Sequence, residues 1–297
     1  MAIRSIFAMT IAFTLFCSSI GMHFPIITNV LATTTTNDSN TGIMDLQRIE
    51  SLLQIIKCNT SLRSKVDLSG CDLSFANFTD ANLRGASLVN ANLNLALLPR
   101  VDLSFANLSD ARLSGANLDY ANLFAAELRS AYLFQASLVN ANLNQAHLIN
   151  ASLRAAYLRG ADLSSATLSF ADLSNAILPS ARFEGANLSN ANLMHVNLQD
   201  ADLSCPHGGT RADFGCVDLS NANIYGGFLP SAKLSGANLS NANLAFANLH
   251  SADLTNAILL NANLSNADLS NARLAGADIN GANFANATKT GCIGCPQ

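Results

Sequence analysis

Residues 86–95 read ASLVN ANLNL, and residues 237–246 read ANLSN ANLAF. This five-residue repeat runs from 66 to 205 as 28 blocks without a shift, and from 212 to 286 as 15 more. Leu is the central residue of 37 of these 43 blocks, and Ala opens 37 of them. A strand repeats its faces every two residues and a helix every 3.6, so neither presents one face every fifth residue. The repeat therefore predicts a chain that turns a corner after each block.

Four such corners close a square coil of about 20 residues, with Leu and Ala pointing inward. Ordering 20 residues costs on the order of 20–40 kcal/mol in backbone entropy. Burying four Leu side chains contributes only roughly 6–12 kcal/mol. One coil therefore needs neighbours on both sides, and we expect about 11 coils, spaced by about 4.8 Å, in a rod roughly 50 Å long.

The blocks follow the pattern A-(N/D)-L-x-x, and over about three quarters of its length the chain resembles the pentapeptide-repeat family. The resemblance implies an all-β solenoid, the right-handed quadrilateral β-helix. It does not imply one function. Some members of the family resemble DNA and act on topoisomerases, and many are exported or lumenal.

Residues 1–32 have the features of a secretory signal, with Arg4 before an apolar stretch at 6–16 and a cleavage position after Ala32. The alternative is an uncleaved membrane anchor, against which Pro25 counts. Cleavage predicts an exported protein of the periplasm, the thylakoid lumen or the extracellular space. We expect no stable membrane insertion after cleavage.

Residues 33–41 are rich in Thr, Asn and Ser and predict a disordered linker. The next segment, 42–65, is predicted to be a short α-helical cap, because an open solenoid end needs cover. A membrane-surface helix is the alternative, but its polar face would carry more than Arg48 and Lys57. The apolar residues at helical spacing are Leu46, Ile49, Leu52, Leu53 and Ile56.

Six cysteines follow the signal, and an even number in an exported chain predicts disulfides. The last two, in the C-terminal tail 287–297, also have the spacing of a zinc half-site or a redox pair. Cys58 and Cys71 would lie at the other end of a rod about 50 Å long, which excludes a zinc site built with them. No thioredoxin-like unit is present, so a structural or loosely ordered tail is favoured. The local pairs are Cys58 with Cys71, Cys205 with Cys216, and Cys292 with Cys295.

The repeat over 66–286 is interrupted after Cys205, where Pro206 and two glycines are turn signals. Either residues 206–211 replace one block with one residue bulged out, or residues 206–216 leave the coil as a loop. A disulfide needs Cα atoms within about 7 Å, and cysteines two blocks apart on a regular coil would sit on different corners. A Cys205–Cys216 bond therefore favours the loop. The lone His207 is interpreted as a solvated residue.

Most outward positions are polar, and the Asn or Asp before each central Leu is expected to bond the nearby backbone. Four apolar residues differ, and their spacings place them on one face of the coil, which Pro99 and Pro179 share. We interpret them as a stripe that binds a protein partner, against the alternative of scattered surface hydrophobes. The stripe residues are Leu97, Val139, Tyr157 and Ile177.

The net charge of −4 with 12% charged residues is too mild and too mixed for a nucleic-acid binder or a strong DNA-like field. Apart from the half-site spacing of the last two cysteines, no phosphate loop, metal-ligand spacing or nucleophile elbow is present in the sequence. We therefore expect an exported, non-catalytic structural or protein-binding module without a cofactor, with an end-to-end or face-to-face homodimer left open. The alternative is a DNA-mimicking, topoisomerase-interacting protein, which needs a cytoplasmic address and a denser row of acids.

Overall fold

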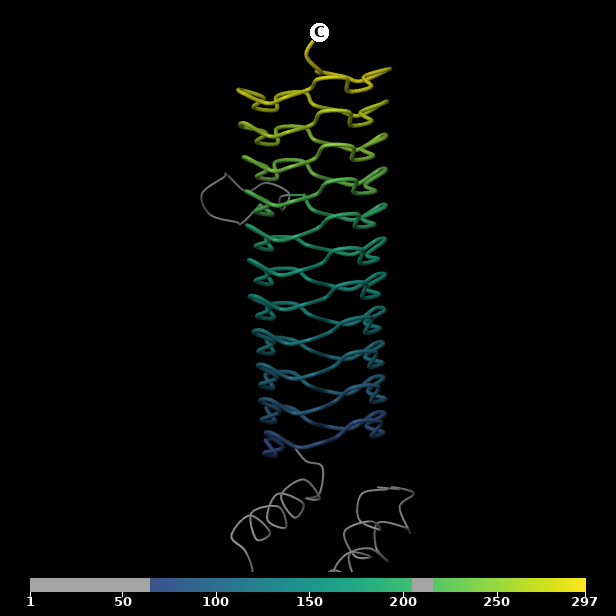
Figure 1. The fold of residues 1–297 in the computed structure, drawn as a ribbon, viewed down its shortest axis with the longest axis vertical. Coiled ribbons are helices and arrows are strands. Elements are labelled where there is room, and N and C mark those ends of the chain that lie inside the picture. The colour runs from purple at the N-terminus through teal and green to yellow at the C-terminus, as the bar shows by residue number, and fades with distance from the viewer. Residues whose placement is uncertain (1–64, 205–215) are drawn as a thin grey trace, which may run out of the picture. The chain divides into compact units, whose positions relative to one another are not determined.

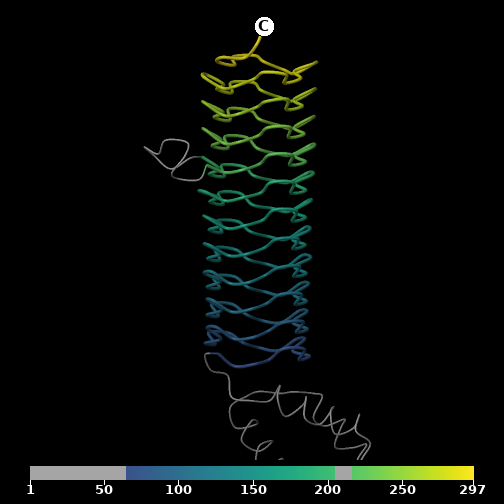
Figure 2. The same ribbon diagram turned by 90° about the vertical axis from the view of Figure 1, so that its left-hand side faces the viewer.

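The computed structural model describes residues 65–204 and 216–297, which all belong to one compact unit, Leu53–Gln297. They form a stack of coils (Figures 1 and 2). These residues contain no helix and no extended strand. Each block instead makes isolated parallel bridges, the first being Asp67↔Ser87 and the last Arg273↔Ile293. The usual bridge joins residues 20 apart, so four blocks close each coil. The bridged residues of the described ranges make eleven coils.

The five positions of a block are called here opening, rung, centre, turn and corner, as in Ala-Asn-Leu-Ser-Asn. Every described corner residue from Lys65 to Gly291, apart from Cys216 beside the interruption, has a positive φ, between 50° and 73°. The opening residue of the next block then donates to the centre carbonyl, as Ala86 N does to Leu83 O at 3.0 Å. A positive φ at the third residue is typical of a type II turn. Asn and Gly tolerate it best, which explains their frequency at the corner.

Three amides of each block join the ladder between coils. The centre amide of Leu158 donates to Ile177 O at 2.7 Å, and the corner amide of Gly160 donates to Pro179 O at 3.0 Å. The rung amide of Tyr157 donates the other way, to Ala136 O at 2.9 Å. The opening amide bonds the centre carbonyl of its own coil, and the turn amide makes no backbone–backbone hydrogen bond. The turn is therefore the one position where proline removes no such bond.

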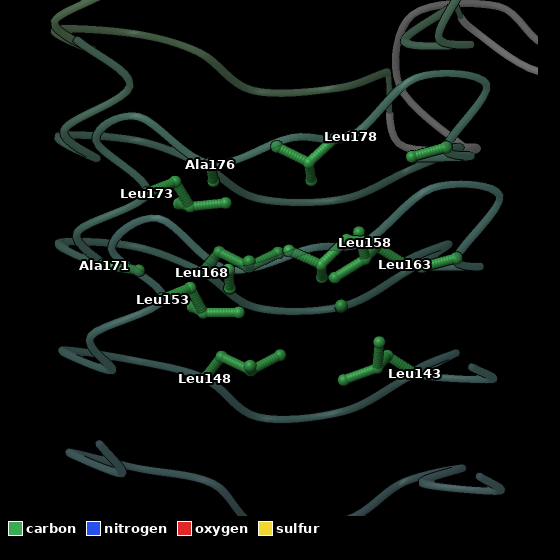
Figure 3. Close-up of a cluster of buried hydrophobic side chains, with 14 of the residues drawn as sticks. Leu143, Leu148, Leu153, Leu158, Leu163, Leu168, Ala171, Leu173, Ala176 and Leu178 are labelled. Carbon is green, nitrogen blue, oxygen red and sulfur yellow. The ribbon is translucent and has the colours of Figure 1, made fainter. Parts of the chain in front are cut away.

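The interior is a column of Leu and Ala (Figure 3). Every described centre from Leu68 to Leu274 is at most 3% exposed, including Phe183 at 0%. Fully burying one such side chain contributes about 1.5–3 kcal/mol. Burial of the inward residues therefore recurs every five residues, together with the turn at each corner.

The C-terminal end of the coil stack is covered by residues that follow the regular blocks. Rungs continue past the end of the regular blocks at 286, to Thr288 and Ile293. Lys289 occupies a centre position, and its Nζ donates to Pro296 O at 2.9 Å and lies 6.0 Å from the Phe284 ring centroid. The charged end of the side chain thus reaches a carbonyl while its stem covers apolar surface.

The interruption lengthens the step between rungs from 20 to 31 residues, as in Asn187↔Asp218. One bulged residue would give a step of 21 and pair Asp218 with Asn197, so that alternative is wrong. The eleven added residues match the loop 206–216. The block 212–216, counted in the sequence as a repeat, therefore falls within the eleven residues that the longer step adds.

Several predictions concern residues outside the described ranges. These are the signal at 1–32, the linker at 33–41, and the helical cap at 42–65 apart from its last residue. That residue, Lys65, is a corner with a φ of 63°.

Candidate protein-binding face

The rung residues define four faces, which begin with Asp67 (face 1), Asp72 (face 2), Asn77 (face 3) and Asn82 (face 4). The rungs of face 3 are, in order, Asn77, Leu97, Asn117, Ser137, Tyr157, Ile177, Asn197, Phe228, Asn248, Asp268 and Thr288. Leu97, Tyr157 and Ile177 therefore share one face, as their spacing predicts. Val139 lies at a turn position of the same face.

The structure brings only some of these residues together. Tyr157 and Ile177 occupy neighbouring coils and are 45% and 38% exposed. Leu97, 47% exposed, lies three coils before Tyr157, which is about 14 Å at the usual strand spacing. Polar rungs fill the two coils between them, and Val139 is half-buried.

One further residue of this face was not predicted from the sequence. Phe228 is a rung of face 3, two coils beyond Ile177, and is 41% exposed. Its distance of 51 residues from Ile177 is two coils of 20 plus the eleven inserted residues. Counting across the interruption with that offset would have found it. We call Leu97, Val139, Tyr157, Ile177 and Phe228 the face 3 stripe.

Hydrogen-bond requirements explain why apolar rungs occur here. At polar rungs such as Asn77 and Asn197, the Oδ1 atom accepts the amide of the turn residue two positions later, at 3.0 Å in both. A proline turn residue has no amide hydrogen, so its rung needs no acceptor. Three of the five stripe residues precede such a proline, in the pairs Leu97 with Pro99, Ile177 with Pro179, and Phe228 with Pro230.

Exposed apolar side chains concentrate around this face. Of the fourteen large hydrophobic residues exposed in the described ranges, nine lie on face 2, on face 3 or at the corner between them. At that corner the Tyr225 ring contacts His195 and Phe246, with centroids 5.9 and 5.3 Å apart. Gly226 makes room for this cluster, since a Cβ there would lie 2.6 Å from His195 Nδ1. The nine are Phe75, Leu95, Leu97, Tyr132, Phe134, Tyr157, Ile177, Phe228 and Phe246.

Face 4 differs in its charges. Its rungs over the second half alternate in sign: Asp162, Arg182, Asp202, Lys233, Asp253 and Arg273. Arg182 Nη1 lies 3.6 Å from Asp162, and Lys233 Nζ lies 3.1 Å from Asp202. Burial raises the pKa of Asp202, but hydrogen bonds from Ser204 and Lys233 outweigh it, and the net shift is downward. In none of the columns along the described coils do acids occupy consecutive coils, so no described face forms a dense acidic row.

The predicted cysteine pairs are described to different extents. The Cys292 and Cys295 sulfurs are 1.98 Å apart, with Cα atoms 5.8 Å apart. Cys71 and Cys216 are each disulfide-bonded. The partners predicted for them, Cys58 and Cys205, lie outside the described ranges, so those two pairings stay predictions.

Within residues 65–204 and 216–297, no helix is long and apolar enough to cross a membrane. The same residues contain no group of three or more His, Cys, Asp or Glu side chains placed to hold a metal ion.

The family model for pentapeptide repeats matches the chain with eight copies, and the chain belongs to this family. Its fold, the right-handed β-helix predicted from the sequence, is confirmed. No curated protein matches the chain. The matched residues are 64–98, 96–123, 126–164, 166–204, 212–245, 229–259 and 247–286.

Solved structures of the family are similar to it. HetL, involved in heterocyst differentiation regulation in the cyanobacterium Nostoc sp. strain PCC 7120, is 30% identical with a TM-score of 0.54, over 84% of this chain and 97% of HetL. The plasmid-mediated fluoroquinolone resistance protein QnrB1 is 19% identical with a TM-score of 0.27, over 59% and 84%. A pentapeptide repeat protein of the Arabidopsis thaliana thylakoid lumen is 27% identical with a TM-score of 0.17, over 44% and 71%.

Proposed function

We propose that this chain is an exported, non-catalytic module that binds a protein partner through the face 3 stripe. The observation that carries the proposal is the pairing of apolar rungs with proline turns on this one face. A proline at the turn has no amide hydrogen, so the rung need not be an Asn that accepts one. The rung position then carries an exposed apolar side chain. Neither burial nor the ladder requires an apolar residue at these positions.

The stripe has the composition of a recognition surface. Tyr157, Ile177 and Phe228 offer aromatic and aliphatic contact area, and binding energy concentrates in a few such residues. They project from rungs fixed by ladder bonds on both sides, so little conformational freedom is lost when a partner binds. No specific observation favours the DNA-mimicking alternative, because the acids of face 4 alternate with bases.

The test replaces Tyr157, Ile177 and Phe228 together by Ser in the full chain. A matched control replaces the face 1 rung His147 and the exposed face 1 turn residue Leu260 by Ser. Because these side chains are outside the interior, both variants should keep the wild-type unfolding midpoint. A partner captured by the wild type and by the face 1 control should be lost from the stripe variant. Retention of that partner by the stripe variant would contradict the proposal.

Export is part of the proposal and is tested separately. Cell fractionation should recover the protein from an exported compartment, and mass spectrometry should show an N-terminus at Thr33. Recovery from the cytoplasm with residues 1–32 intact would contradict export and would restore the topoisomerase alternative.

A further inference from the structure

The middle of face 2 carries two arginines around two aromatic rings, and we call Arg112, Tyr132, Phe134 and Arg154 the face 2 patch. Arg112 and Tyr132 are rungs of neighbouring coils. Phe134 lies two residues beyond Tyr132, and Arg154 occupies the same turn position one coil later. Tyr132 is 54% exposed and Phe134 38%, and both arginines are exposed.

Both arginines lack an acidic partner in the described part of the chain. Arg100, Arg129, Arg182 and Lys233 each lie within 4 Å of a carboxylate, whereas Arg112 and Arg154 do not. The Arg154 guanidinium lies 5.5 Å from the Phe134 ring centroid, which orients it while leaving its charge uncompensated.

Arg112 has no role in the backbone. At most coils of face 2 the rung side chain accepts the turn amide, as Asn92 does from Asn94. At Arg112 the Ser114 amide instead donates to Asn94 Oδ1 of the preceding coil, at 2.9 Å. The rung position is therefore available for a side chain that serves no turn. On face 3 proline has the same effect, because the rung there need not accept a turn amide either.

The patch is short and has defined ends. Along the rung column the nearest acids are Asp72 and Asp172, with only Asn92, Arg112, Tyr132 and Ser152 between them. Both carboxylates are engaged, since each accepts the amide of its turn serine and the side-chain amide of the next coil's Asn. Asp110, at the corner before Arg112, is exposed and makes no ion pair with it.

The spacing indicates what the patch can bind. Arg112 and Arg154 are two coils apart, or about 10 Å along the rod. A peptide in the extended polyproline II conformation advances about 3.1 Å per residue and has three residues per turn. Carboxylates three residues apart on such a peptide project to the same side, about 9 Å apart, and would meet both guanidiniums, with the residues between them beside the rings. Guanidinium groups suit carboxylates because they donate two parallel hydrogen bonds.

We propose that the face 2 patch binds an extended acidic segment of a protein, with two carboxylates three residues apart and an apolar residue between them. A nucleic acid is disfavoured, because a polyanion would extend over Asp72 and Asp172 on a chain of net charge −4. The proposal does not rest on the face 3 stripe, and either can fail without the other.

The experiment titrates the full chain into a fluorescein-labelled peptide, Gly-Glu-Leu-Ala-Glu-Gly, and follows anisotropy at low and moderate salt. The double variant R112Q/R154Q should bind at least tenfold more weakly, and a peptide with Gln in place of both Glu should lose as much. The control R84Q removes another arginine stacked on an aromatic ring, that of Phe105 at 4.5 Å on face 4. It should bind like the wild type.

Equal binding by R112Q/R154Q and the wild type would overturn the proposal, and so would equal binding of the Gln peptide. Tighter binding of a single-stranded oligonucleotide or of heparin than of the peptide would overturn the assignment to protein. A second variant, R112K/R154K, keeps the charge and the fold. It should bind the peptide more weakly than the wild type does, because Lys cannot form a bidentate contact with a carboxylate. Full wild-type affinity would overturn the proposed guanidinium–carboxylate contacts.

Discussion

Faces 3 and 4 share the same backbone ladder but differ in their exposed side chains, which include apolar residues on face 3 and charged residues on face 4. On face 4, from Asp162 to Arg273, each charge has an opposite charge on the next coil, and two pairs are in contact. On face 3, Tyr157, Ile177 and Phe228 are exposed and nothing in the described chain covers them. The interior thus fixes the coil and leaves the faces free. A rung side chain is available to contact a partner where it is not needed as the hydrogen-bond acceptor of its turn amide.

The largest effect should come from the interior that both faces share. Leu158 is completely buried and Tyr157, its neighbour, is 45% exposed. Leu158→Ala should lower the free energy of unfolding by about 2–5 kcal/mol through the cavity it leaves. Tyr157→Ser should change it by no more than about 0.5 kcal/mol, since surface substitutions away from special features have little effect. Urea unfolding measures both, and similar losses would contradict the division between interior and face.

The next effect tests the account of rungs and prolines. Asn107 Oδ1 accepts the Ser109 amide at 3.0 Å and its hydroxyl at 2.7 Å. Asn107→Ile should therefore cost about 0.5–1.5 kcal/mol, the usual net value of a hydrogen bond. The reverse exchange, Ile177→Asn, should leave the unfolding free energy nearly unchanged, because Pro179 has no amide to satisfy. Equal costs at the two positions would show that proline does not release the rung.

A smaller effect separates the charges of face 4 from those of face 2. Arg182→Glu places three acids on consecutive coils, with Asp162 and Asp202 on either side. We expect a loss of about 0.2–1 kcal/mol, the size of a cross-strand charge effect. Arg112→Glu lies between Asn92 and Tyr132 and should leave thermal unfolding unchanged at low salt. A larger loss for Arg112→Glu would mean that its charge stabilises the fold.

The smallest effect is a pH dependence of stability at Asp202 and Lys233, which pair across the interruption. The folded pKa of Asp202 lies below its ordinary value of 3.8, so the carboxylate contributes stability above 3.8 that is lost as the pH falls through the lower folded pKa. The wild type should therefore exceed Asp202→Asn in stability near neutral pH and lose that advantage in acid. Lys233→Met should reduce this pH dependence, and an advantage that grew in acid would refute the assigned sign.

The five-residue repeat was sufficient to predict the coil, its four faces and its Leu and Ala interior, because burial and turn geometry recur in every block. It placed Leu97, Tyr157 and Ile177 on one face for the same reason. Phe228 and Pro230 were not assigned to this face from the sequence. The register across an insertion depends on which coils pair, and local spacing does not show that pairing. The link between Ile177 and Pro179 also needed the structure, since only the hydrogen bonds show that the turn amide is outside the ladder.

The central claim is that face 3 contacts the partner, and crosslinking tests it most directly. A photoreactive phenylalanine is placed singly at 157, 177 and 228 on face 3, and at 147, 167 and 187 on the opposite face 1. The account predicts crosslinks to one and the same protein from all three face 3 positions and none from face 1. Equal crosslinking from both faces, or crosslinks from face 1 alone, would contradict it.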